Sequence, residues 1–206
     1  MILALSGSSV DGSLYVDVVD LARRSPVWWD DMVTVWSAYG LGVFALLMTA
    51  VWWRSRRVGA GTAVAALAVP FVVVLAYAVN SLLKLLVREV RPCRTLHVVT
   101  LEACPARTDW SFPSNHAAIA AAAAVALLLV ARRLGVSRRL GALACLAAVA
   151  MAASRVWVGA HYPHDVAVGL LSGALVAYVV MRALLRRPET LARRLAATRL
   201  RPLLVS

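Results

Sequence analysis

The sequence predicts an all-α protein, a polytopic membrane helix bundle of about five spans with an N-terminal interfacial helix. Hydrophobic residues make up 62% of the 206 residues and the mean hydropathy is +0.77, whereas a soluble domain is rarely more than half apolar. Five runs hold no Asp, Glu, Lys or Arg: 33–53, 59–83, 112–131, 140–154 and 166–181. The first three supply the ~20 residues that a helix needs to cross a bilayer core of ~30 Å. The last two adjoin polar segments that can complete a span.

The elements can be assigned in order along one integral-membrane domain, 1–206, because no segment remains for a separate soluble domain. Residues 10–24 alternate polar and apolar side chains at helical spacing, which predicts an amphipathic helix in the outer interface. The predicted spans are 32–53, 60–87, 114–132, 138–157 and 163–185. Residues 88–112 contain two prolines and several charges, so we expect an outer loop there. Residues 188–206 are expected to form a basic cytoplasmic tail.

The formal net charge of +12 does not indicate nucleic-acid binding, because the charges are sorted along the chain. With five spans, fourteen arginines fall on one side of the membrane and nine acids on the other. Positively charged residues stay cytoplasmic, so the C-terminus is expected inside and the acidic side outside. The arginines are Arg54, Arg56, Arg57, Arg132, Arg133, Arg138, Arg139, Arg182, Arg186, Arg187, Arg193, Arg194, Arg199 and Arg201, and the acids are Asp11, Asp17, Asp20, Asp30, Asp31, Glu89, Glu102, Asp109 and Asp165.

Three cysteines give limited information. Cys93 and Cys104 share the predicted outer loop, where an oxidising compartment permits a disulfide. Two cysteines do not define a disulfide framework, so a bridge and two free thiols both remain open. Cys145 falls within a span and is expected to be a small packing residue.

The segment Pro113-Ser114-Asn115-His116 opens the third span. Proline favours the start of a helix and serine or asparagine favours its cap. The free backbone amides of a helix N-terminus bind anions, so Ser114 and Asn115 are candidate phosphate ligands with His116 beside them. A histidine that only anchors the interface is the alternative interpretation.

His161 and Asp165 are four residues apart, which places them on one helical face or on the turn leading into it. An aspartate bonded to one imidazole nitrogen fixes the tautomer and leaves the other nitrogen free to attack phosphorus. The alternative is a metal pair, with His116 or His164 as a third ligand. Nearby cationic side chains would repel a divalent ion, so we expect no metal.

Lys84, Arg91 and Arg155 lie at span ends, where ionisable groups are costly and are usually functional. Guanidinium groups bind phosphate bidentately, and lysine adds a point charge. Three cations match the equatorial oxygens of a phosphoryl group in its transition state, where charge stabilisation is most needed. Lysine or arginine reaching to the outer surface is the structural alternative.

These three motifs resemble the signature of the type-2 phosphatidic acid phosphatase superfamily. In chain order they are Lys84-x6-Arg91-Pro92, the segment 113–116, and Ser154-Arg155-x5-His161-x3-Asp165. The flanking segments 110–117 and 154–166 are also similar to the bacitracin-resistance type of undecaprenyl pyrophosphate phosphatase. Asn115 departs from that branch, which often carries aspartate there. The resemblance implies a bacterial cell (inner) membrane protein, and the charge distribution predicts that its motifs face outward.

The resemblance also implies a role for each matching residue. His161 is expected to be the nucleophile, Asp165 to orient it, and His116 to be the general acid and then the base for water. Phosphate is expected to bind Lys84, Arg91, Ser114, Asn115 and Arg155. His97, Tyr162 and His164 receive no role, and Arg88 and Arg94 either contact a second phosphate or remain solvated.

The predicted function is therefore metal-independent removal of the terminal phosphate of a polyprenyl diphosphate at the outer leaflet. It would proceed through a phosphohistidine, without a cofactor, and would recycle the lipid carrier of cell-wall synthesis. A second hypothesis keeps the chemistry but changes the lipid to phosphatidate, phosphatidylglycerophosphate or a polyprenyl-phosphosugar phosphate. A third is a non-enzymatic transporter or scaffold, since charged span residues can line a pathway. The expected partners are a lipid phosphate and membrane lipids, with no nucleic acid; the sequence does not indicate an oligomeric state.

Overall fold

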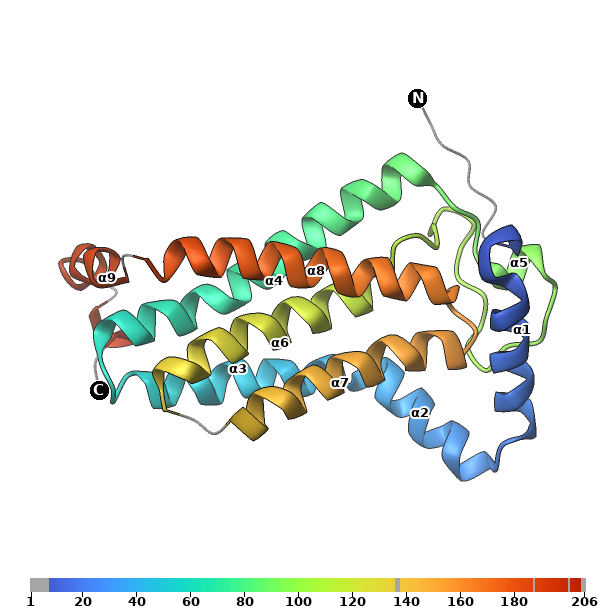
Figure 1. Ribbon diagram of the computed structural model, residues 1–206, viewed down its shortest axis with the longest axis horizontal. Helices are drawn as coiled ribbons and strands as arrows, with labels where there is room; N and C mark the ends of the chain where they lie inside the picture. Colours follow the sequence, from blue (N-terminus) through green and yellow to red (C-terminus); the bar gives the residue numbers. More distant parts are fainter. Residues whose placement is uncertain (1–7, 136–137, 187, 200, 205–206) are drawn as a thin grey trace.

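The computed structural model describes residues 8–135, 138–186, 188–199 and 201–204. Within these residues every regular element is a helix, as the all-α prediction requires (Figure 1). The elements are α1 (Ser8–Arg24), α2 (Val27–Tyr39), α3 (Leu41–Ser55), α4 (Ala60–Val87), α5 (Pro92–Thr95), α6 (Asn115–Arg133), α7 (Arg138–Trp157), α8 (Pro163–Leu184), α9 (Pro188–Ala196) and the 3₁₀ turn η1 (Arg201–Leu203). Arg187, one of the fourteen sorted arginines, lies outside the described residues.

Three helical segments are long and apolar enough to cross a membrane: Ala60–Thr95, Asn115–Arg133 and Pro163–Leu184. A fourth crossing is possible only if α2 and α3 count together, since they meet at an angle of 52°. The apolar part of α7, Gly141–Trp157, is shorter than these. By length and composition the described residues thus offer three or four of the five predicted spans, with α7 the element that falls short.

The continuous helix predicted over 32–53 is interrupted at Gly40. A Cβ at that position would lie 2.5 Å from the Trp36 carbonyl oxygen and 2.7 Å from the Met151 side chain. The backbone oxygen of Trp36 leaves no room for a Cβ, so this position requires glycine, which also weakens a helix. The bend carries α2 away from the bundle axis, while α3 follows the axis (Figure 1).

Helix α6 is the centre of the bundle and packs against α4, α7 and α8. Its alanines at positions 117, 118, 120–124 and 126 are buried. Gly173 of α8 lies against Ala118 of α6, so closely that a Cβ there would be 2.1 Å from the Ala118 carbonyl oxygen. Small residues allow such close approach of helices in lipid, and here they fix the relative height of the N-termini of α6 and α8.

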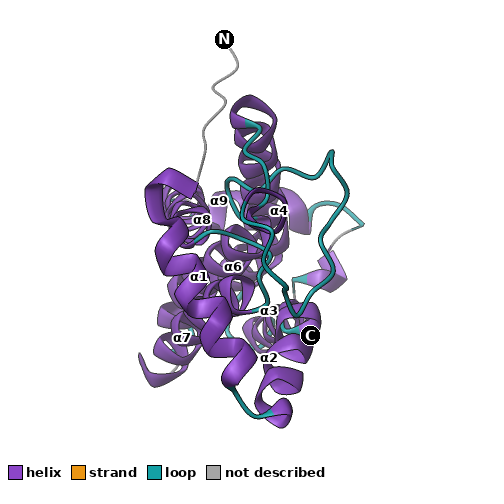
Figure 2. Ribbon diagram, turned by 90° about the vertical axis from the view of Figure 1, so that its right-hand side faces the viewer, coloured by secondary structure: helices purple, strands orange, loops and turns teal. Residues whose placement is uncertain are grey.

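Helix α1 lies across one end of the bundle, with the 88–114 loop beside it (Figure 2). It contains the predicted amphipathic segment 10–24, and Tyr15, Val19 and Ala22 are its buried apolar residues. The Tyr15 hydroxyl donates a 2.9 Å hydrogen bond to the Gly159 carbonyl in the turn between α7 and α8. We call this end of the bundle, which also holds all three motifs, the motif end.

The 88–114 loop is closed by a disulfide between Cys93 and Cys104. This answers the question that the sequence left open for these two residues. At the opposite end of the bundle, α9 packs on the start of α4 through Ala192.

Candidate active site

His161 and Asp165 form the buried pair that their spacing predicts. His161 lies in the α7–α8 turn and Asp165 in the first turn of α8, and their side chains are 2% and 0% exposed. The distance from His161 Nδ1 to Asp165 Oδ2 is 3.1 Å. The same carboxylate oxygen accepts a 2.9 Å hydrogen bond from the Tyr162 backbone amide and another from the Ser111 hydroxyl. A carboxylate held this firmly favours the tautomer with hydrogen on Nδ1, so Nε2 keeps its lone pair.

His161 Nε2 faces cationic side chains. Its distance to Arg91 Nη1 is 3.3 Å. Burial lowers the pKa of His161 well below its ordinary value, and the positive charges of Arg91, Lys84 and Arg155 lower it further. The ring is therefore neutral at physiological pH, which is the state in which an imidazole can act as a nucleophile.

Lys84 and Arg91 converge on one acidic side chain, that of Asp109. Its carboxylate lies 3.0 Å from Arg91 Nη2 and 3.6 Å from Lys84 Nζ. Backbone carbonyls hold both cations: Lys84 Nζ donates to Trp110 at 2.7 Å, and Arg91 Nη1 donates to Ala160 at 2.7 Å. Burial alone would raise the pKa of Asp109, but Arg91 and Lys84 outweigh it, so that pKa is lowered and the carboxylate is ionised.

Arg155 has an equivalent partner in Glu102. Its Nη1 lies 2.8 Å from Glu102 Oε2, and its Nη2 donates to Oε1 at 3.2 Å. Nη1 also donates to the Ser37 hydroxyl of α2 at 2.6 Å. Glu102 and Asp109 both belong to the 88–114 loop. Carboxylates from one loop thus pair with all three predicted phosphate-binding cations, as the oxygens of a bound phosphate would.

Ser114 and Asn115 lie where α6 begins, as predicted. The Ser114 hydroxyl caps the helix by accepting from the Ala117 amide at 3.5 Å. The Asn115 side chain, however, turns to α4: its Oδ1 accepts from Asn80 at 2.7 Å and its Nδ2 donates to Ser81 at 3.4 Å. Asn115 can therefore offer phosphate its backbone amide at the helix N-terminus, while its side chain joins α6 to α4.

His116 lies in the first turn of α6 and is partly buried. Its electrostatic neighbours include Arg155, Glu102, Lys84 and Arg91, and it acts on His161 in turn. Within the described ranges its ring forms no hydrogen bond, so both nitrogens can meet a ligand. The two histidines thus lie at one site, together with the three cations.

Several residues of this site were missed by sequence reasoning. Ser111 precedes the second motif by two residues and donates to Asp165. Asn80 is fully buried and connects α4 with α6 and α8, since Ser172 donates to its Oδ1 at 2.8 Å. A polar side chain inside the apolar run 59–83 was the only available signal for Asn80.

His164, which received no role from the sequence, connects α8 to α1 and to Glu89. Its Nδ1 lies 2.8 Å from Asp11 of α1, and its Nε2 lies 3.1 Å from Glu89. An imidazole with a carboxylate at each nitrogen satisfies both only as the doubly protonated cation. The ring also stacks on Tyr162, with 5.4 Å between the ring centroids.

Glu89, His164 and Asp165 are also the residues that geometry offers to a metal ion. Their ligand atoms lie within 4.8 Å of one another. The second oxygen of Asp165 holds His161, and both His164 nitrogens face carboxylates. A metal there would have to displace the proton that links His164 to Glu89.

The residues of this site lie in a segment that matches a known protein family. The model of the PAP2 superfamily matches residues 65–189, which include every predicted site residue. The chain belongs to the PAP2 superfamily. It is accordingly a PAP2-type lipid phosphatase.

Relatives within the PAP2 superfamily act on several lipids. The chain is 27% identical to the undecaprenyl-diphosphatase BcrC of Bacillus subtilis, over 74% of each chain. It is 40% identical to a decaprenylphosphoryl-5-phosphoribose phosphatase of Mycobacterium tuberculosis, over 51% of this chain and 53% of the relative. That second match therefore spans about half the length of either protein.

The fold matches that of a solved PAP2 protein, a transmembrane phosphatidylglycerolphosphate phosphatase from Bacillus subtilis. The TM-score is 0.59 and the match covers 84% of this chain and 83% of the other. The sequence identity is 19%, so this likeness concerns the fold. The neighbour is a transmembrane protein, as expected for a polytopic membrane helix bundle.

Proposed function

We propose that this PAP2 phosphatase removes the terminal phosphate of a polyprenyl diphosphate at the outer leaflet, through a phosphohistidine and without a metal. The observation that carries the proposal is the alignment of Asp165, His161 and Arg91. Asp165 holds Nδ1, and the free Nε2 points to the guanidinium that would bind the phosphate. The nucleophile thereby contacts both its orienting group and its charge stabiliser.

The first chemical step transfers the phosphoryl group to His161. The incoming phosphate replaces the carboxylates of Asp109 and Glu102 on the three cations. Nε2 of His161 then attacks phosphorus as the bond to the bridging oxygen breaks, and His116 gives a proton to that oxygen so that the polyprenyl phosphate leaves. Asp165 stabilises the positive charge that develops on the imidazole of His161.

The second step regenerates the enzyme. His116, now without that proton, accepts one from water, and the hydroxyl attacks phosphorus as the N–P bond breaks. Inorganic phosphate leaves, and the Nε2 lone pair returns to His161. Lys84, Arg91 and Arg155 stabilise the equatorial oxygens in both transition states.

The apolar surface beside α7 supports a polyprenyl tail. Two apolar hollows of about 620 and 670 Å³ lie along α7 and share Leu143 and Ala147. The first reaches Ser154 and Trp157 at the motif end, next to Arg155. The second continues to Arg54 at the opposite end. Two adjoining apolar hollows along the bundle suit a single long hydrocarbon chain whose headgroup is at the cations.

The outward orientation rests on charge and redox chemistry. Arginines concentrate at the ends of α3, α6 and α8 that lie away from the motifs, which favours a cytoplasmic location for those ends. The Cys93–Cys104 disulfide closes the loop at the motif end, and disulfides persist mainly outside the cytoplasm. Both observations support a site facing outward and a cytoplasmic C-terminus.

A second candidate substrate is a polyprenyl-phosphosugar phosphate, which the Mycobacterium tuberculosis relative favours through its 40% identity. Purified protein should therefore be assayed with undecaprenyl diphosphate, a decaprenylphosphoryl-ribose phosphate, phosphatidylglycerophosphate and phosphatidate, each with and without chelator. We expect chelator-resistant phosphate release that is fastest with the diphosphate, and none from His161→Ala. A faster reaction with another lipid would replace the proposed substrate, and loss of activity on chelation would overturn the metal-free mechanism.

A further inference from the structure

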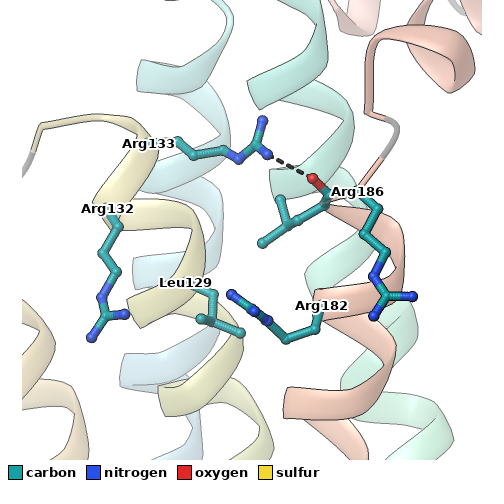
Figure 3. A pocket seen from close by; sticks show the side chains of 6 residues that line it. Leu129, Arg132, Arg133, Arg182 and Arg186 are labelled. Atoms are coloured by element: carbon teal, nitrogen blue, oxygen red, sulfur yellow. Dashed lines mark hydrogen bonds between the residues drawn. The ribbon is translucent and has the colours of Figure 1, made fainter.

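The end of the bundle opposite the motifs contains a cavity of about 300 Å³ between the C-terminal turns of α6 and α8. Leu129, Arg132 and Arg133 line it from α6, and Arg182 lines it from α8. Leu185 and Arg186, which follow α8 in the chain, complete the lining. Figure 3 shows this arrangement, with Leu129 lying between Arg132 and Arg182. We call it the distal arginine pocket.

The charge of the distal arginine pocket has no acidic partner. In the part of the chain that the structure describes, none of its four guanidinium groups forms an ion pair. Arg133 donates to the Leu185 carbonyl at 2.7 Å (Figure 3), and Arg182 lies 5.9 Å from the centroid of the Tyr178 ring. Four positive groups around one small cavity repel one another, so an anion in the cavity would relieve that repulsion.

No acidic side chain of the described residues supplies that anion. Nine of the protein's ten acids precede α8 or lie in its first turn, and the tenth is Glu189. The Glu189 carboxylate lies against Gly61 in the first turn of α4, where a Cβ would be 2.0 Å from it. A carboxylate at a helix N-terminus is stabilised by the helix dipole, so Glu189 is already engaged elsewhere.

The composition of the pocket indicates which anion fits. Arginine forks bind phosphate oxygens bidentately, and Leu129 and Leu185 add apolar surface beside them. The pocket also lies at the ends of two membrane-spanning helices, the level at which lipid headgroups are found. Basic pockets between spans bind anionic headgroups at this level.

We infer that the distal arginine pocket binds the phosphate headgroup of an anionic phospholipid, in the leaflet opposite the active site. The lipid would neutralise the arginines and would bridge α6 to α8 at their far ends. These same helices carry Ser114, His116 and Asp165 at the motif end. Free phosphate has the same charged group but no acyl chain to hold it in the leaflet, so it is expected to bind to the pocket much more weakly.

The test compares two triple variants that remove the same charge. Arg132→Gln, Arg182→Gln and Arg186→Gln together empty the pocket of three cations. The matched control is Arg193→Gln, Arg194→Gln and Arg199→Gln, whose side chains are exposed on and after α9. Native mass spectrometry would count dioleoylphosphatidylglycerol bound to each purified protein, with dioleoylphosphatidylcholine and inorganic phosphate as separate probes.

We expect phosphatidylglycerol to bind the wild type and the control equally, and to bind the pocket variant about tenfold more weakly. Equal weakening in both variants would assign the binding to diffuse charge and would overturn the inference. Undiminished binding to the pocket variant, or displacement of the lipid by millimolar inorganic phosphate, would also overturn it. Hydrolysis of a lipid phosphate by each variant checks folding; if the triple variant is misfolded, Arg182→Gln alone must still weaken lipid binding.

Discussion

The Asp109 carboxylate lies 3.0 Å from the Arg91 guanidinium, where the proposed mechanism places a phosphate oxygen. A substrate must displace it, so the pair competes with binding. Because the Asp109 side chain is about half exposed, the competition is worth less than about 1 kcal/mol. We predict that Asp109→Asn lowers KM about threefold, and the inhibition constant of vanadate similarly, with little change in kcat.

The matched control for Asp109→Asn is Asp31→Asn, which removes the same charge from an exposed position on α2. It should leave KM unchanged at physiological ionic strength. A higher KM in Asp109→Asn would contradict the competition, because it would mean that Asp109 mainly positions Arg91 for the substrate.

Asp165→Asn should disable His161 without removing it. The asparagine amide can donate a hydrogen bond to Nδ1, which favours the tautomer that carries hydrogen on Nε2. We predict a fall in kcat of about 10³-fold or more with a small change in KM, as for triad aspartates elsewhere. Rapid-quench detection of the acid-labile phosphoenzyme should show its loss, and an unchanged kcat would remove Asp165 from its proposed role.

His116→Ala should reveal the proton donor through the leaving group. The glyceryl oxygen of phosphatidate is an alkyl oxygen that needs a proton as it departs, so hydrolysis of phosphatidate should slow by about 10²- to 10⁴-fold. Nitrophenolate departs from nitrophenyl phosphate without that help, so phosphoenzyme formation from that substrate should slow much less. His97→Asn, at an exposed position of the outer loop, should leave both rates near wild type. Equal loss with both leaving groups would argue against general-acid catalysis by His116.

The pH dependence of kcat/KM should reflect the lowered pKa of His161. The reaction requires the neutral ring, and that pKa is held below its ordinary value of about 6.5 by burial, Arg91, Lys84 and Arg155. Activity should therefore persist on the acid side of pH 6.5 and be lost only as pH falls through the depressed pKa. Arg91→Gln removes one of those charges, so it should move the acidic limb to higher pH as well as raise KM. An acidic limb that does not move would contradict the electrostatic role of Arg91.

The sequence predicted the chemical groups of the candidate site better than their environment. His161 and Asp165 are four residues apart, so local helical geometry alone brings them together. Asp109 and Glu102 were treated only as charges on the outer side. Their pairing with Arg91 and Arg155 depends on how the 88–114 loop folds back, and no local periodicity encodes that path. Asn115 was predicted as a phosphate ligand, but the hydrogen bonds of its side chain to Asn80 and Ser81 on α4 were not foreseen.

The helices were predictable from apolar runs, but the break in the first run was not. Gly40 is one glycine among several in apolar segments, and only the folded backbone shows that the Trp36 carbonyl oxygen approaches it too closely for a Cβ. Likewise His164 carried no signal of its own, because its partners Asp11 and Glu89 are 153 and 75 residues away in the chain. Such long-range contacts are set by tertiary packing rather than by sequence spacing.

The contacts of α1 have a consequence for how the enzyme is made. Tyr15 bonds to Gly159 and Asp11 to His164, across 144 and 153 residues. A ribosome releases α1 well before the turn that holds His161. Both contacts of α1 therefore wait until the start of α8 has been synthesised, so α1 docks on the motif end no earlier than the proposed nucleophile and its aspartate.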